Sequence, residues 1–305
     1  MSDRHPGALR LLSVHAHPDD ESSKGAATLA RYAAEGVDVL VATCTGGERG
    51  SVLNPAMDRP EVRADLARIR RAEMAAAREI LGVRQRFLGF VDSGMPGPGE
   101  PLPDGCFAAL PVGLAAAPLV ALIREFRPQV VVTYDETGGY PHPDHVMTHR
   151  VTVAAVEAAA APERHPGTGD PWQVSKLYYH LALSRAWFRA LHTAMTERGV
   201  PSEMGELLAD WPDGPPALAT TTRIACSEWF AVRDAALLAH ATQVRPGTAF
   251  MAHPRDIERE VWPTEDYHLA RSLVPGGGAG RAAGGYETDL FAGLRAGAEG
   301  QVGEG

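Results

Sequence analysis

The feature that most constrains the fold is a regular alternation of short apolar runs with stretches of helical periodicity. Strand-like runs lie at about 9–15, 37–44, 85–91, 129–134 and 175–181. Helical patterns separate the first four runs and follow the fourth, at about 23–35, 62–81, 114–126 and 144–160. Strands that alternate with helices are typical of a parallel sheet, because each helix returns the chain to the edge from which the next strand starts.

The composition of these strands indicates which kind of parallel sheet to expect. The runs VDVLVATC and PQVVVTY are continuously apolar and rich in valine, as strands covered by helices on both faces should be. We therefore predict an α/β fold, a Rossmann-like, doubly wound and mostly parallel sheet. A smaller and less regular C-terminal portion follows, with helical patterns near 185–198 and 227–242 around the strand-like run TTTRIACS.

The C-terminal region of the sequence is rich in glycine. It contains the glycine-rich run GGGAGRAAGG, which has neither a preceding strand nor a clear following helix, so it does not match a phosphate-binding loop. We predict one catalytic domain over residues 1–274 and a flexible tail over 275–305.

Charge and hydrophobic patterning exclude several classes of partner. The formal net charge is −9 without a block of like charges, which argues against nucleic-acid binding. No apolar run approaches the roughly 18 residues of a membrane span. The start, MSDRHPGALR, lacks the pattern of a secretory signal, and the three cysteines form no CxxC pair. These observations predict a cytoplasmic protein with reduced thiols.

Two segments rich in histidine and aspartate follow predicted strands. HAHPDDE, residues 15–21, comes after the first strand, and GGYPHPDH, residues 138–145, comes after the fourth. Ligands of open α/β sheets bind outside the carboxyl ends of the strands, so both segments lie where a site is expected. Neither contains GxGxxG, which argues against a dinucleotide site.

Imidazole nitrogen and carboxylate oxygen suit zinc, and catalytic zinc usually keeps three protein ligands and one open position. His17, Asp20 and His145 supply such a set. We predict that they bind one Zn²⁺ per chain, with Fe²⁺ as an alternative for the same N/O ligands. A single His-Asp pair would more often be a helix cap, but two such clusters at strand ends of one sheet favour a metal site.

The remaining polar residues of these segments suit hydrolysis. Asp19 is our candidate general base, placed to take the proton of a water whose pKa zinc lowers towards about 7. His142 is expected to hydrogen-bond the developing oxyanion or protonate the departing amine, with assistance from Tyr140. Asp144 is expected to orient His142 or another imidazole. The HxxxH spacing of His145 and His149 lacks the glutamate of a zincin, so we expect His149 to pack on a helix.

HAHPDDE and PHPDH, together with TGGERG, resemble the LmbE-like or PIG-L superfamily of zinc N-deacetylases. Within it the sequence more closely resembles the mycothiol S-conjugate amidases, through HAHPDDESSKGAATLARYAAEG, TGGERGSVLNPAMD, LGFVDSG and SKLYY. The resemblance implies the same three metal ligands, with the general base at Asp19 and the carbonyl-polarising histidine at His142.

The resemblance also implies substrate contacts. Arg70 and Asp92 match residues that hold sugar and inositol hydroxyls in the related deacetylase, and Lys24 matches a lysine typical of the amidases. Glu48 is expected to line the pocket or to hold its loop. From spacing alone, Arg70 and Asp92 would be surface or salt-bridge residues and Lys24 an exposed helix residue. The sequence departs from the amidase pattern at Thr137 and over residues 160–220.

The activity implied by the resemblance is hydrolysis of the amide of a mycothiol S-conjugate, an amino-sugar thiol conjugate, in detoxification or in antibiotic biosynthesis. The alternative is N-deacetylation of N-acetylglucosaminyl-inositol or a related amino sugar. A third hypothesis, from another class, is a non-catalytic metal- or sugar-binding module. We expect a small-molecule substrate and neither a nucleic-acid nor a membrane partner, and the sequence leaves the oligomeric state open.

Overall fold

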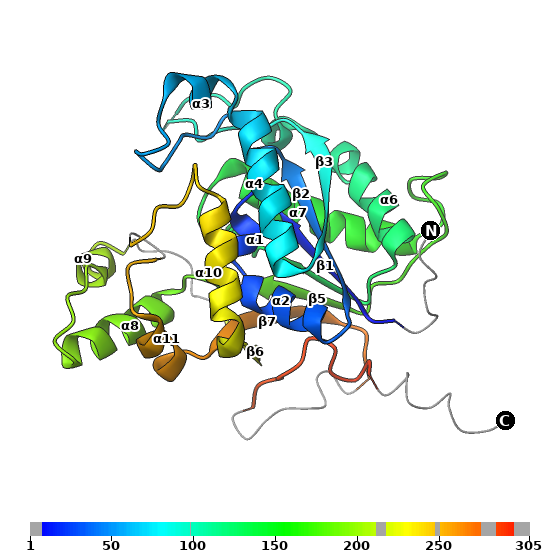
Figure 1. The fold of residues 1–305 in the computed structure, drawn as a ribbon. Coiled ribbons are helices and arrows are strands. Elements are labelled where there is room, and N and C mark those ends of the chain that lie inside the picture. The colour runs from blue at the N-terminus through cyan, green and yellow to red at the C-terminus, as the bar shows by residue number, and fades with distance from the viewer. Residues whose placement is uncertain (1–7, 98, 212–217, 248–250, 276–284, 296–305) are drawn as a thin grey trace.

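The computed structural model describes residues 8–97, 99–211, 218–247, 251–275 and 285–295 (Figure 1). The strands are β1 (Arg10–His15), β2 (Asp38–Thr45), β3 (Arg84–Phe90), β4 (Val130–Thr133), β5 (Lys176–His180), β6 (Thr222–Ala225) and β7 (Thr264–Ser272). The helices are α1 (Asp20–Ser23), α2 (Ala26–Ala34), α3 (Pro60–Ala64), α4 (Leu66–Leu81), η1 (Phe107–Ala109), α5 (Val112–Ala115), α6 (Ala117–Phe126), α7 (Pro143–Ala160), α8 (Arg185–Glu197), α9 (Met204–Ala209), η2 (Ser227–Trp229), α10 (Phe230–Ala239) and α11 (Arg255–Val261). None of the helices in these ranges is both long and apolar enough to cross a membrane.

The strands form one sheet in the order β3-β2-β1-β4-β5-β7-β6. The first five strands are parallel, whereas β7 runs antiparallel to both of its neighbours. β1 pairs with β2 from Arg10 opposite Asp38 to His15 opposite Thr43, and its other edge pairs with β4. The predicted doubly wound, mostly parallel sheet is confirmed. The order reverses between β1 and β4, which is where such sheets bind ligands.

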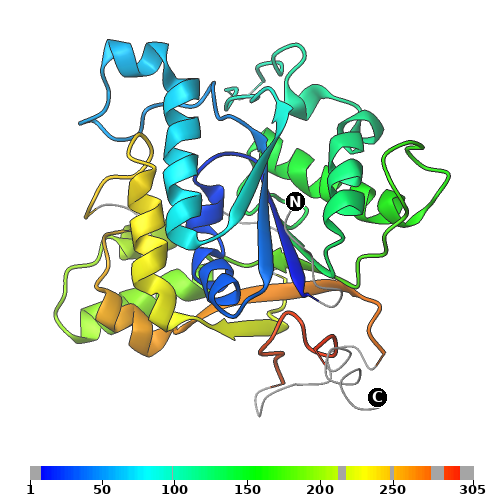
Figure 2. The ribbon, with the colours of Figure 1, turned by 45° about the vertical axis from the view of Figure 1, so that its right-hand side comes forward.

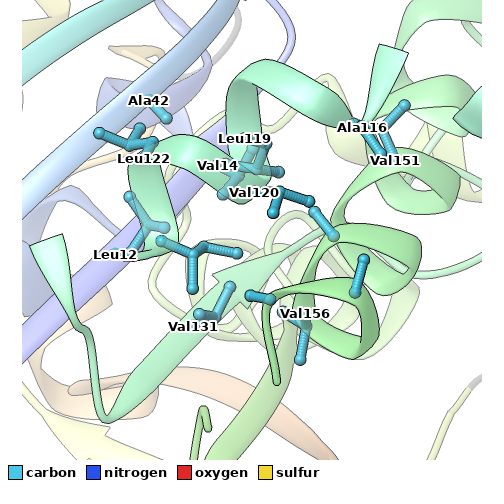
Figure 3. Packing of buried hydrophobic residues seen from close by; sticks show 14 of the residues in the cluster. Leu12, Val14, Ala42, Ala116, Leu119, Val120, Leu122, Val131, Val151 and Val156 are labelled. Atoms are coloured by element: carbon cyan, nitrogen blue, oxygen red, sulfur yellow. The ribbon is translucent and has the colours of Figure 1, made fainter. Parts of the chain in front are cut away.

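Apolar side chains on alternate strand positions explain why both faces of the sheet are covered. On one face, residues of β1, β2 and β4 pack against α6 and α7; Figure 3 labels members of this core, among them Leu12, Val14, Val131, Leu119, Val120 and Val151. On the other face, Leu11, Val39 and Val132 contact residues of α2, α4 and α10. Figure 2 shows these two groups of helices on either side of the sheet. The period of two along each strand directs successive residues into different cores.

The predicted less regular C-terminal portion is confirmed as a group of short helices at one side of the sheet (Figure 1). Leu191 and Met195 of α8 pack with Met204 of α9 and Ile257 of α11 in a small separate core. The strand β6 lies within the predicted run TTTRIACS, but β7 was not predicted. Its sequence, TEDYHLARS, has few of the β-branched residues that mark the central strands.

Two predicted helices are broken in the structure. The pattern at 23–35 is interrupted near its start by an extended Lys24 and by Gly25 at φ +96°, which separate α2 from the short α1 before it; a Cβ at Gly25 would lie 3.1 Å from the Tyr267 hydroxyl. The pattern at 114–126 becomes α5 and α6, because Pro118 cannot donate the backbone hydrogen bond that would join them. Apolar periodicity does not detect such breaks, since the same face stays buried.

The predicted flexible tail is wrong for residues 285–295. Leu290 and Phe291 are fully buried in the core that contains α2. The carboxylate of Glu287 accepts hydrogen bonds from Lys176 Nζ (2.8 Å) and Tyr178 Oη (2.7 Å), inside the protein. This segment therefore closes one end of the domain, whereas the other residues predicted as tail, 276–284 and 296–305, lie outside the described residues.

We expect Glu287→Ala to lower the free energy of unfolding by about 3–5 kcal/mol, because it leaves the buried ammonium of Lys176 without its counter-charge. Glu125→Ala, which removes the exposed partner of Arg86, is the matched control and should cost about 1 kcal/mol or less. Urea denaturation monitored by tryptophan fluorescence measures both. Equal losses would contradict a structural role for the Lys176–Glu287 pair.

Candidate metal centre and active site

The two predicted His/Asp segments meet at the carboxyl ends of β1 and β4. The loop after β1 leads into α1, and the loop after β4 leads into α7, whose first residue is Pro143. The ring of His17 lies 5.3 Å from the ring of His145 and 4.6 Å from that of His142, measured between centroids. His17 thus faces His142 and His145, far from it in the sequence, at the point where the strand order reverses.

The three predicted metal ligands converge on a small volume. The Oδ2 atom of Asp20 lies 3.4 Å from Nδ1 of His17 and 3.3 Å from Nε2 of His145. Ligand atoms of a tetrahedral zinc lie about 2.0–2.1 Å from the ion and therefore about 3.3–3.4 Å from one another. All three residues are buried, at 7% exposure or less. The two distances from Asp20 to the histidine nitrogens therefore match those between ligands of one divalent ion.

The hydrogen bonds of His145 leave one ring nitrogen free for a metal. Its Nδ1 donates to the carbonyl of Gly138 (3.0 Å), so the neutral ring carries its lone pair on Nε2. That Nε2 is buried and has no hydrogen-bond partner, although Asp20 is close. A buried nitrogen with an unused lone pair is costly in protein alone but suits a metal ligand.

Asp144 orients the ring of His17 through a hydrogen bond, as the Gly138 carbonyl orients the ring of His145. Its Oδ2 accepts a hydrogen bond from His17 Nε2 (3.3 Å) and another from the backbone amide of Ser93 (2.8 Å). In the neutral ring that a metal ligand requires, the lone pair of His17 is then on Nδ1, the atom that faces Asp20. Asp144 was predicted to orient His142 or another imidazole, and its carboxylate contacts His17.

Other donor sets overlap with this one. Ligand atoms of His17, His142 and His145 lie within 4.8 Å of one another, and so do those of His17, Asp92 and Asp144. In the second set, however, both carboxylates already accept backbone amides, Asp92 from Arg49 and Gly94 and Asp144 from Ser93. Asp20 Oδ2 likewise accepts the backbone amide of His17 (2.9 Å), so these contacts do not decide between the sets, and the assignment of Asp20 as a ligand stays a prediction.

Asp19 has a constrained backbone and a partly accessible carboxylate. Its φ of 107° is in the left-handed region that non-glycine residues seldom occupy. The guanidinium of Arg70 donates to Asp19 Oδ2 (3.1 Å) and to the carbonyl of Pro18 (2.6 Å). Burial raises the pKa of Asp19, while the charge of Arg70 acts in the opposite direction. A carboxylate with a raised pKa is better able to accept a proton near neutral pH.

His142 is neutral and presents an N–H to the site. Burial, and then the charges that His17 and His145 can carry, lower the pKa of His142 to about 3. Its Nδ1 accepts a hydrogen bond from the backbone amide of Asp144 (3.1 Å), which places the ring proton on Nε2. Tyr140 lies edge-on to His145, at 4.6 Å between ring centroids, and is 46% exposed. It therefore sits where it can reach a bound substrate.

The predicted substrate-contacting residues have protein partners, and all of them except the partly exposed Glu48 are buried. Lys24, 8% exposed, donates from Nζ to Asp20 Oδ1 (2.6 Å), so it is not an exposed helix residue. Arg70 and Asp92 are also buried, and Asp92 contacts His17 at 3.6 Å. Glu48 holds its loop by accepting the Asp92 amide (3.1 Å) and lines a cavity of about 420 Å³. Direct contact of these four residues with substrate stays a prediction.

Several neighbouring residues were missed. Tyr134 follows β4, stacks on His145 at 4.4 Å and accepts the amide of Ala16 with its hydroxyl (2.9 Å). His15 ends β1 and His180 ends β5, and their rings stack at 6.0 Å. Tyr134 and His180 also lie at the carboxyl ends of strands, so applying the strand-end rule to single residues would have found them, whereas His15 already belongs to the predicted segment HAHPDDE. The predicted packing role of His149 agrees with its hydrogen bond to the Tyr134 carbonyl (3.0 Å).

Comparison with known proteins agrees with this geometry. Residues 12–156 match the family model described as PIG-L, GlcNAc-PI de-N-acetylase. The sequence is 52% identical to the mycothiol S-conjugate amidase of Streptomyces coelicolor, over 94% of this chain and 98% of that relative. The chain belongs to the PIG-L family.

Other relatives of this chain are named as deacetylases. The 1D-myo-inositol 2-acetamido-2-deoxy-alpha-D-glucopyranoside deacetylase of Streptomyces avermitilis is 41% identical over 93% of this chain and 97% of that relative. A solved structure of a conserved protein from Thermus thermophilus has a TM-score of 0.55 at 25% identity, covering 87% and 96% of the two chains. The zinc-inhibited form of teicoplanin deacetylase Orf2 has a TM-score of 0.54 at 21% identity, covering 86% and 99%, and shows the shared fold.

Gly138 offers a test of the metal centre. A Cβ at Gly138 would lie 2.6 Å from the Cβ of His145, whereas one at Gly139, which has nearly the same φ, would meet nothing within 4 Å. We expect Gly138→Ala to lower zinc affinity about 10- to 100-fold by displacing His145, and Gly139→Ala to change it little. Competition with a chromophoric chelator measures both affinities. Equal effects would show that backbone strain, and not the position of His145, controls binding.

Proposed function

We propose that this protein is a zinc-dependent hydrolase that cleaves the amide bond between the glucosaminyl-inositol and N-acetylcysteine parts of mycothiol S-conjugates. Water adds across that amide, and the products are glucosaminyl-inositol and an N-acetylcysteine conjugate. One observation carries the proposal: Asp19 and a neutral His142 flank His17, Asp20 and His145 in a chain 52% identical to such an amidase.

His17 Nδ1, Asp20 Oδ2 and His145 Nε2 would hold the metal. The N/O/N donor set, the 3.3–3.4 Å spacing and the buried, unpartnered His145 Nε2 all fit such an ion. Zinc bound there supplies a Lewis acid that polarises the amide carbonyl and makes a water molecule more acidic. Iron(II) suits the same ligands, and metal analysis of protein purified without air distinguishes the two.

The chain's own residues would move the protons. Asp19 takes a proton from the attacking water, as its partly exposed carboxylate and raised pKa allow. His142 donates a hydrogen bond from Nε2–H to the oxygen on which negative charge develops. Asp19 then returns its proton to the departing amine. Tyr140 assists at the same oxygen.

Two other functions are the competing hypotheses. Deacetylation of N-acetylglucosaminyl-inositol requires the same chemistry on a smaller acyl group, and relatives such as the 41% identical Streptomyces avermitilis protein bear that name. A non-catalytic metal-binding module would need neither Asp19 nor His142, yet both are held by specific hydrogen bonds beside the metal ligands. Hydrolysis is therefore the better supported function.

The general base can be separated from the metal ligands by mutation. We expect Asp19→Asn, which tolerates the left-handed backbone, to retain zinc and lose about 100- to 10,000-fold in kcat. His145→Ala should lose both activity and zinc, because it removes a ligand. Steady-state kinetics and elemental analysis measure the two effects. Full activity in Asp19→Asn would remove that residue from the mechanism.

Substrate choice tests the proposed activity directly. We expect a higher kcat/KM for a mycothiol S-conjugate than for N-acetylglucosaminyl-inositol, and a larger loss for the conjugate in Lys24→Ala. Zinc content must be measured in parallel, because Lys24 also contacts the ligand Asp20. A preference for the acetylated sugar that persists in Lys24→Ala would support the deacetylase instead.

A further inference from the structure

We propose that Glu21 and His240 form a positioning pair that holds Asp19 in its catalytic conformation. The inference rests on the proposed function, since it assigns Asp19 as the general base. Neither Glu21 nor His240 faces the reacting atoms, so both act through Asp19.

The starting observation is the backbone of Asp19. Its φ of 107° and ψ of −27° are unfavourable for an aspartate, and only four non-glycine residues among the described ones have positive φ. Such a conformation persists only where surrounding contacts hold it, and strained residues gather at functional sites. The contacts of Asp19 must therefore offset this strain.

Glu21 supplies one of these contacts. Its Oε2 accepts a hydrogen bond from the backbone amide of Asp19 (3.0 Å), two residues earlier in the chain. The carbonyl of Asp19 accepts the amides of Ser22 and Ser23, each at 3.0 Å. The peptide groups on both sides of Asp19 are thus hydrogen-bonded to α1, and the peptide before Asp19 is held by two side chains, Glu21 at its amide and Arg70 at the Pro18 carbonyl.

His240 holds Glu21 in place. Its Nε2 lies 2.8 Å from Glu21 Oε1, and both side chains are fully buried although they are 219 residues apart in the sequence. A buried ion pair adds little net stability, because desolvation offsets the attraction between the charges. It fixes geometry well, however, because two fully buried side chains have little room to change conformation.

The segment that carries His240 is itself anchored to α4. The amide and hydroxyl of Thr242 donate to the carboxylate of Glu73 (2.8 and 2.7 Å), one turn of α4 beyond Arg70. Arg70 binds the Asp19 carboxylate from the other side (3.1 Å). Asp19 is therefore held between α4 on one side and the pair Glu21–His240 on the other, which fixes both its backbone and its carboxylate.

Loss of His240 would remove the histidine partner of the buried Glu21 carboxylate and leave only the Ser22 hydroxyl and the Asp19 amide as its donors. Glu21 would then turn towards water or another donor, and the Asp19 amide would lose its hydrogen bond. A small displacement of a general base costs turnover but not substrate binding. The expected signature is thus a lower kcat with an unchanged KM and unchanged zinc content.

The first experiment compares variants of His240 in the zinc-loaded enzyme. We expect His240→Ala to lower kcat about 10- to 100-fold with unchanged KM. His240→Gln, which keeps a donor for Glu21, should recover most of that loss. His192→Ala on α8, whose Nδ1 contacts Ser202, is the control and should stay within about twofold of the wild type. If His240→Ala does not fold, Glu21→Gln replaces it. An unchanged kcat, or a rise in KM alone, would overturn the proposal.

The second experiment asks whether the pair acts through Asp19. In an Asp19→Asn background, His240→Ala should have no further effect on residual turnover, because the group that it positions is already lost. A drop equal to that seen in the wild-type background would show that His240 acts elsewhere and would overturn the proposal.

A third measurement separates this proposal from the proposed function, because it does not depend on activity. In a crystal structure of His240→Ala, we expect Asp19 to leave its positive φ or its carboxylate to move away from Arg70. An unchanged Asp19 would overturn the positioning role. A shifted Asp19 in an enzyme that hydrolyses neither candidate substrate would support the positioning role while the proposed function fails.

Discussion

The hydrogen bond from the His17 ring to the Asp144 carboxylate is the contact on which the rest of the site depends. It joins residues 127 positions apart, from the loop after β1 and the first turn of α7. It also sets the tautomer of His17, so that Nδ1 faces Asp20. Since Asp144 binds the Ser93 amide as well, the loops after β1, β3 and β4 meet at one carboxylate. The sheet order makes this possible by placing β1 beside β4.

How far the site could be predicted depended on sequence distance. His17, Asp20 and His145 were identifiable because each lies in a dense polar cluster at a strand end, and the structure brings them together. The pair Glu21–His240 could not be predicted, because no local pattern connects residues that meet only when α10 packs beside α1. The contact of Lys24 with Asp20 is local, four residues apart, and was missed for a different reason: the predicted continuous helix is interrupted, and the break at Gly25 ends α1 and turns Lys24 inward.

The fold was predictable where burial produces a strong pattern. β2 and β4 are buried by helices on both faces and appear in the sequence as valine-rich runs, and all five parallel strands were predicted within about a residue of their observed bounds. β7 lacks that signal because many of its residues are only partly buried. Residues 285–295 follow a glycine-rich run, and the hydrophobic signal of Leu290 and Phe291 is too short to indicate the core that they complete.

That closing segment bears on how the chain acquires its fold during synthesis. The hydroxyl of Tyr32 in α2 donates to Asp289 and accepts the amide of Leu290, at separations of 257 and 258 residues. β7 likewise lies between β5 and β6, although the ribosome makes it after both. A nascent polypeptide can therefore pair its early parallel strands but cannot complete the sheet until nearly all of it has emerged. Until then, β5 lacks the strand that pairs with its outer edge, and the core beside α2 lacks Phe291.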